Sequence, residues 1–176
     1  FYDENLDVKK LFSCKLSNTN LKKRLLFVNV LPHSSIMYKK NAAIKVGWYS
    51  KKFEYAQDFN LTLKLLKKND IYLIKEYLTN IIQPLNNMSN SSTFEKIRIK
   101  ENINILKNNL NNSDNLSNDK TILQNLIYIY SIKLALSSMS LNFIKSFKNL
   151  IKIFYKNPSI IFKLKLIEKL LEIKKI

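Results

Sequence analysis

The stretch YSKKFEYAQDFNLTLKLLKK, residues 49–68, contains a regular apolar pattern. Phe59, Leu63 and Leu66 recur at the spacing of one helix face. The pattern predicts an amphipathic helix that begins close to Asp58. An acidic residue in the first turn of a helix accepts backbone N–H groups and meets the positive end of the helix dipole. Asp58 is therefore expected to stabilise the start of this helix.

Short apolar runs lie on both sides of the predicted helix. HSSIMYKK, residues 33–40, and IYLI, residues 71–74, are typical of short strands. KKNAAIKVG, residues 39–47, predicts a short helix that ends at Gly47, because glycine suits the left-handed position after a helix. The following aromatic segment, residues 48–57, predicts a loop. Mixed short elements of this kind predict an α/β front half, in which the strand at 33–40 joins a mixed sheet.

The back half of the chain has sustained helical periods, separated by breaks rich in asparagine and serine. They predict one helix over 93–110, two helices within 121–157 and a last basic helix over 158–175. The expected organisation is an α/β domain at 1–88 followed by an all-α region at 89–176.

Scarce residue types exclude several classes of site. The single cysteine, Cys14, excludes an intrachain disulfide and a multi-cysteine zinc site, and the single histidine, His33, excludes a multi-histidine cluster. The single glycine, Gly47, excludes the glycine-rich loops that bind nucleotide phosphates. The chain also has no D-x-D pair, which is a common Mg²⁺ or Mn²⁺ ligand pattern.

The formal charge of +17, from 30 basic against 13 acidic residues, favours an anionic partner. A general richness in lysine, asparagine and isoleucine accounts for part of this excess. Nucleic-acid binding would gather the basic residues on one face among exposed aromatics. The lysines are instead spread along the chain, and the helical aromatics are interpreted as core: Tyr128, Tyr130, Phe143, Phe147 and Phe154. A membrane span is not expected, because the uncharged run at 121–132 is only twelve residues long.

The run from residue 33 to residue 80 resembles the C-terminal part of the catalytic domain of family 2 glycosyltransferases, which have the GT-A fold. In that family a histidine–serine strand leads to a basic pair, a short helix, a glycine–aromatic turn, a loop and a helix that opens on an acidic residue. The matching positions are His33, Ser34, Lys39, Lys40, Gly47, Trp48, Tyr49, Ala56, Gln57, Asp58, Phe59, Asn60, Leu61, Leu63, Lys64 and Leu65.

The resemblance implies a partial GT-A-like, Rossmann-like mixed sheet and a role in cell-envelope polysaccharide biosynthesis. The reaction would transfer a sugar from a nucleotide-sugar donor to a glycan or lipid-linked acceptor. Asp58 occupies the position of the catalytic base, and His33, Gln57 and Trp48 occupy substrate-binding positions. Gln57 stands where the family usually has glutamate.

The sequence also departs from the family. Ile81, Ile82 and Pro84 replace a tyrosine, an arginine and a histidine, and the nucleotide-binding half with its D-x-D is absent. Mg²⁺ or Mn²⁺ is therefore expected in the complete enzyme, with no metal site in this chain, and the chain alone is expected to be inactive. The expected location is the cytoplasm, with peripheral contact to the inner face of the membrane through the basic C-terminal helices.

Two alternatives stay open beside the transferase. One is a basic helical module that binds nucleic acid or an anionic membrane surface. The other is an inactive remnant of a transferase. Nucleic acid is not expected as a partner on the transferase interpretation.

Overall fold

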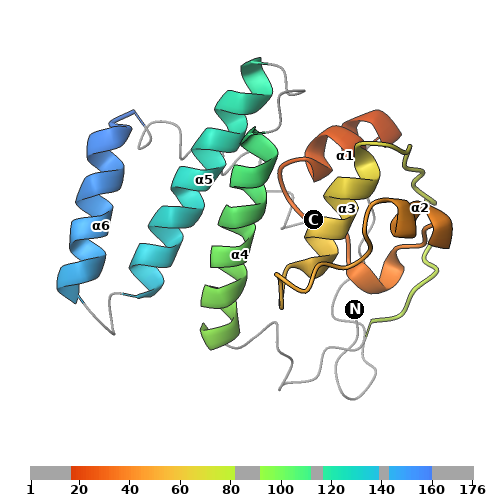
Figure 1. Cartoon of the computed structure of the whole chain (residues 1–176), viewed down its shortest axis with the longest axis horizontal. Coiled ribbons are helices and arrows are strands. Elements are labelled where there is room, and N and C mark those ends of the chain that lie inside the picture. Colours follow the sequence, from red (N-terminus) through yellow and green to blue (C-terminus); the bar gives the residue numbers. More distant parts are fainter. Residues whose placement is uncertain (1–16, 82–91, 112–116, 139–142, 160–176) are drawn as a thin grey trace. The chain divides into compact units, whose positions relative to one another are not determined.

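A computed structural model describes residues 17–81, 92–111, 117–138 and 143–159 (Figure 1). All regular elements in these ranges are helices. The chain divides into two compact units, with the boundary after Phe94. Helices α1 to α3 belong to the first unit, and the second contains α5, α6 and α4 from Glu95 onward.

The predicted mixed sheet is wrong, because no strand is found in the described part of the chain. Residues 33–40, predicted as a strand, form a 3₁₀ turn over His33–Ser35 and then an extended segment. Ile36 has the extended angles φ −97° and ψ 130°, but extended backbone becomes a strand only when a second strand accepts its hydrogen bonds. In the second predicted strand, the N–H of Leu73 donates instead to Asn18 Oδ1, at 2.9 Å.

Helix α1, Asn18–Leu25, begins at a side-chain cap, because Ser17 Oγ accepts the N–H of Asn20 at 3.2 Å. The basic residues of α1 lie in its last turn, where they meet the negative end of the helix dipole. Helices α2, Lys40–Lys45, and α3, Gln57–Leu66, follow, and both confirm the helices predicted there.

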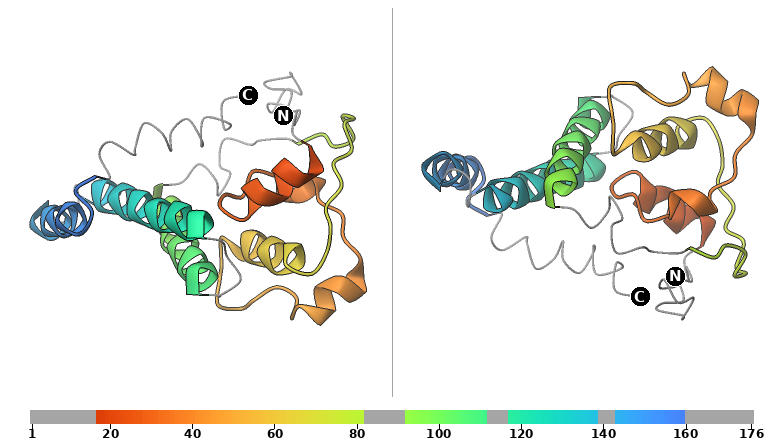
Figure 2. Two further views of the ribbon diagram at one scale, coloured as in Figure 1. Left: turned by 90° about the horizontal axis from the view of Figure 1, so that it is seen from above. Right: turned by 90° about the horizontal axis from the view of Figure 1, so that it is seen from below.

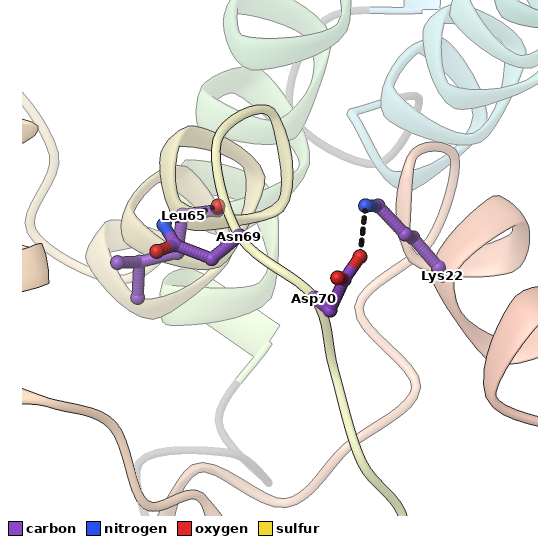
Figure 3. A network of polar contacts seen from close by, with 4 residues as sticks. All are labelled: Lys22, Leu65, Asn69 and Asp70. Atoms are coloured by element: carbon purple, nitrogen blue, oxygen red, sulfur yellow. Dashed lines mark hydrogen bonds and ion pairs between the residues drawn. The ribbon is translucent and has the colours of Figure 1, made fainter.

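The first unit has a small apolar core between α1 and α3. Its centre is formed by the buried residues Leu21, Leu25 and Leu66, with Val30, Leu31, Ile71 and Leu73 packed around them. Polar contacts close the end of α3 beside this core (Figure 3). Asn69 Nδ2 donates to the carbonyl of Leu65 at 2.9 Å, and Lys22 Nζ lies 3.0 Å from Asp70 Oδ1, which ties α1 to the segment that follows α3.

Two successive left-handed residues end α2. Gly47 has φ 83°, as expected for a glycine after a helix, and Trp48 has φ 54°. The turn is held by hydrogen bonds from Gly47 N to the carbonyl of Ile44, at 2.9 Å, and from Trp48 N to the carbonyl of Ala43, at 2.8 Å. The positive φ angles and these two hydrogen bonds therefore set the direction in which the loop after Trp48 leaves α2.

The second unit consists of α4, Ser92–Asn111, α5, Ser117–Ser137, and α6, Phe143–Lys156. These helices confirm the prediction of one helix over 93–110 and two within 121–157. Helix α5 lies between α4 and α6 in each view (Figure 2). Lys133 Nζ on α5 pairs with Glu95 Oε1 on α4 at 2.6 Å.

Among the described residues, no helix is long and apolar enough to cross a bilayer. The last helix predicted at 158–175 lies almost entirely outside the described residues.

Candidate functional site

Asp58 lies in the first turn of α3, where Ala56 occupies the cap position without a side-chain bond. Its carboxylate is half-buried and both of its oxygens are engaged. Oδ2 accepts a hydrogen bond from Asn29 Nδ2 at 2.8 Å, and Oδ1 accepts the N–H of Phe59 at 2.7 Å. The carboxylate is thus held in one orientation by a distant side chain and by its own helix.

A chain of hydrogen bonds runs through Tyr49 in the same unit. The Tyr49 hydroxyl lies 2.7 Å from His33 Nε2 and 2.8 Å from the Tyr38 hydroxyl. Each hydroxyl can donate or accept, so the direction of the chain follows the tautomer of His33. His33 is exposed, so this chain leads from the solvent to the half-buried Tyr38.

Burial, above all, raises the pKa of Tyr49 to about 12, and the hydrogen bond and charge of Tyr38 add to the effect. The negative charge of Asp58 raises the pKa of Tyr49 further, which places the carboxylate within electrostatic reach of this hydroxyl. Tyr49 therefore stays protonated at neutral pH and serves as a neutral hydrogen-bonding group.

Three edge-to-face ring contacts hold four residues together as an aromatic cluster: His33, Tyr38, Trp48 and Tyr49. Tyr49 meets His33 and Trp48, with ring centroids 5.8 Å apart in both pairs, and Trp48 also meets Tyr38 at 6.2 Å. Trp48 is still 40% exposed, so part of its indole faces solvent. A left-handed tryptophan is unusual backbone strain, and strain of this kind gathers at functional sites. An exposed aromatic face beside polar groups is suited to stacking against a sugar ring.

No protein-family model, curated protein or solved structure matches the chain.

The structure brings together three of the four residues that the sequence singles out. His33 and Trp48 both contact Tyr49, and Asp58 acts on Tyr49 through its charge. Gln57 is the first residue of α3 and is exposed. No sequence pattern pointed to Asn29, whose amide comes from the segment after α1.

Metal ligands are not gathered at this site. Across the described ranges, no group of three or more histidine, cysteine, aspartate or glutamate side chains could hold a metal ion. The Mg²⁺ or Mn²⁺ that the resemblance implies stays a prediction, and the chemistry considered below uses no metal bound by the described residues.

The second unit has a basic groove of about 730 Å³ between α4, α5 and α6. The groove is lined by five lysines and by no acidic residue: Lys100, Lys107, Lys145, Lys152 and Lys156. Ile127, Leu134 and Ala135 contribute apolar surface from α5. The lysines are therefore gathered more closely than the sequence suggested.

The interpretation of the helical aromatics as core is wrong for two residues on α6. Phe143 is 59% exposed and Phe147 is 49% exposed. By contrast, Tyr130 on α5 is half-buried, and its burial raises its pKa.

Proposed function

We propose that the first unit carries the catalytic-base side of a glycosyl-transfer site. Asp58 takes the proton from an acceptor hydroxyl while the hydroxyl oxygen attacks the anomeric carbon of a nucleotide-sugar. The bond from that carbon to the diphosphate breaks, and the electron pair leaves with the nucleoside diphosphate. The acceptor is a glycan or a lipid-linked saccharide.

One observation supports the proposal above the others: the carboxylate of Asp58 is half-buried, fixed by Asn29, and electrostatically coupled to Tyr49. A general base must be held within hydrogen-bond reach of the proton it takes. A carboxylate that serves only the helix needs no side-chain donor from 29 residues away in the sequence.

The order of the elements that resemble the family also supports Asp58 as the base. The predicted mixed sheet gives no support, because the described residues contain no strand. A short helix, a glycine–aromatic turn and a helix that opens on an acidic residue follow one another as α2, Gly47–Trp48 and α3. The proposal depends on these helical elements and on the aromatic cluster, and it requires a donor half from outside the described residues.

Binding of the acceptor can be tested on the chain itself. Trp48 is the only tryptophan, so its fluorescence reports directly on the cluster. We expect titration with cell-envelope oligosaccharides to change this fluorescence in the wild type and in Asp58→Asn, because the base is needed for transfer and not for stacking. A fluorescence that no saccharide alters would argue against an acceptor site at Trp48.

Catalysis needs a second measurement, made on the enzyme that includes the sugar-nucleotide half. Transfer from nucleotide-sugars should require Asp58, and the 176-residue chain alone should not turn over the donor. Turnover by that chain above a no-protein control would overturn the division of the site between two halves.

A further inference from the structure

Helix α6 has an unusual distribution of buried and exposed residues. The only residue of α6 that is fully buried is Ser146. Three of its large apolar side chains, Leu150, Ile153 and Phe154, are half-buried. The other five are exposed to solvent by about half or more: Phe143 (59%), Ile144 (68%), Phe147 (49%), Ile151 (54%) and Tyr155 (87%). We call these five residues the apolar stripe.

The apolar stripe is continuous along the helix. Its members are spaced three or four residues apart, or are direct neighbours, and they fall on one side of a helix with 3.6 residues per turn. Phe143 and Phe147 stack with their rings 5.8 Å apart and nearly parallel, at 9°. Contiguous apolar surface of this kind marks an interaction site more often than scattered apolar residues do.

The polar side of α6 is basic. The segment Phe143–Lys156 holds four lysines and no acidic residue. Lys145, Lys152 and Lys156 line the basic groove, and Lys148 is exposed at the border between these lysines and the apolar stripe. An anionic partner is therefore favoured, and it must also offer an apolar region for the stripe.

We propose that α6 docks on an anionic lipid bilayer surface, lying in the interface with its apolar stripe among the upper acyl chains and its lysines among the lipid phosphates. A helix with exposed aromatics and isoleucines on one side and lysines on the other is typical of interfacial helices. With 14 residues α6 is about 21 Å long, which is shorter than the roughly 30 Å hydrocarbon core of a bilayer, so the proposal places it along the surface.

Other partners satisfy only one side of α6. A nucleic acid would neutralise the lysines but would leave the apolar stripe in water. A second copy of the chain could cover the stripe but would bring two rows of lysines together. The bilayer surface meets both requirements, and this inference is independent of glycosyl transfer.

Flotation with vesicles tests the proposal on the intact chain. We expect binding to phosphatidylcholine vesicles that contain phosphatidylglycerol, weaker binding as salt rises, and little binding to phosphatidylcholine alone. The double variant Phe143→Ser/Phe147→Ser should lower binding about tenfold or more, because two rings no longer leave water. The matched control, Tyr72→Ser/Leu78→Ser, replaces two exposed apolar residues of the first unit and should bind like the wild type.

A charge variant tests the other side of the helix. Lys148→Gln/Lys152→Gln should weaken binding to the anionic vesicles. The control Lys51→Gln/Lys52→Gln, at exposed lysines of the first unit, should weaken this binding less. Far-UV circular dichroism checks that each variant keeps its helices. If the double phenylalanine variant loses helix, Tyr155→Ser, at an 87% exposed residue, replaces it.

Three outcomes would overturn the proposal. One is equal binding of the wild type and the stripe variant to anionic vesicles. Another is that the wild type does not bind vesicles but forms a dimer in sedimentation velocity, and that the stripe variant does not form this dimer. This result would assign the stripe to contact with a second copy of the chain. The third is preferential binding of single-stranded oligonucleotide, with vesicles unbound, which would assign the basic side to nucleic acid.

Discussion

The side-chain amide of Asn29 donates a 2.8 Å hydrogen bond to Oδ2 of Asp58, a residue 29 positions further along the chain. The amide oxygen of Asn29 is buried and has no hydrogen-bond partner. Leaving a buried acceptor unpaired costs about 1–3 kcal/mol. If the amide of Asn29 rotated by half a turn, its oxygen would face the Asp58 carboxylate, and the two negatively polarised groups would repel each other. Asn29 is therefore fixed with its N–H₂ group on Asp58, and it acts as a positioning residue.

This relationship predicts that Asp58→Asn separates the helix from the chemistry. In the variant the amide of Asn29 can rotate, so that its free oxygen accepts a hydrogen bond from the new amide, while the oxygen of that amide accepts the N–H of Phe59. We expect the melting temperature to stay within a few degrees. Transfer by the complete enzyme should fall about 10²- to 10⁴-fold, because an amide does not take the proton.

Thermal melting and acceptor-dependent transfer, measured side by side, check this expectation. Asp70→Asn is the matched control, since Asp70 forms only an exposed ion pair with Lys22, and it should change neither quantity much. Retained transfer in Asp58→Asn would return Asp58 to a purely structural role. Gln57→Glu, which introduces the residue that is usual in the resembling family, should leave stability unchanged, and a raised transfer rate would indicate that glutamate suits the site better than Gln57 does.

Tyr49 predicts a stability loss at alkaline pH. Its pKa is raised from 10.0 to about 12, mainly by burial, so the folded chain keeps a proton that the unfolded chain releases. The contribution of Tyr49 to stability is present below pH 10.0 and is lost as the pH rises toward about 12. Urea unfolding across this window should show a smaller loss for Tyr49→Phe than for the wild type.

Phenolate absorbance provides the direct measurement. The alkaline titration of the wild type should include a late component that is reduced in Tyr49→Phe. Tyr72→Phe, at an 81% exposed tyrosine, serves as the control and should keep the late component. An unchanged late component in Tyr49→Phe would contradict the burial of this hydroxyl.

Gly47→Ala should destabilise the first unit through its backbone alone. A Cβ atom at this position would meet nothing within 4 Å, but φ is +83°. The left-handed conformation costs an L-residue with a Cβ atom about 1–2 kcal/mol. Asparagine tolerates this conformation better, so Gly47→Asn should lose less stability than Gly47→Ala in urea unfolding. Equal losses would indicate a cause other than backbone conformation.

Leu66→Ala should lower the free energy of unfolding of the first unit by about 2–5 kcal/mol, because it leaves a cavity in a small core. Leu66 is 5% exposed and packs with Leu21 and Leu25. Trp48 fluorescence follows the loss, since Trp48 belongs to the same unit. Lys67→Ala, at the exposed next position, should change this free energy by no more than about 0.5 kcal/mol.

Helices α2 to α6 could be predicted from the sequence, because each has its own helical periodicity, whereas α1, Asn18–Leu25, was not predicted. Helix α3 begins at Gln57 beside the predicted Asp58, and α2 ends before Gly47 as expected. The sheet was predicted wrongly, because an apolar run such as IYLI, residues 71–74, has strand composition whether or not a partner strand exists. Whether a strand forms depends on the partner.

The candidate site was only partly predictable for a similar reason. The roles of His33, Trp48 and Asp58 were expectations from a resemblance, whereas Tyr49, which contacts His33 and Trp48, was only one of the matching positions. Asn29 had no sequence signal, because an asparagine after a helix is common in turns. On α6, the apolar residues were expected to pack inward, but periodicity shows only that an apolar side exists and not what covers it.

The burial of Ser146 alone among the α6 residues also has a consequence for local unfolding. The apolar residues that α6 shields from solvent, Leu150, Ile153 and Phe154, are only half-buried. The helix therefore gains less from apolar burial than a helix with fully buried residues does, and less free energy opposes its detachment. Regions with few buried apolar contacts open first and exchange their amide protons fastest. In solution, α6 should therefore lose amide protection earlier than α4, whose Ile99, Ile103 and Leu106 are buried. On an anionic bilayer we expect the order of amide protection to reverse, with α6 better protected than α4. Adsorption would place the apolar stripe in contact with lipid and keep the backbone hydrogen bonds of α6 formed.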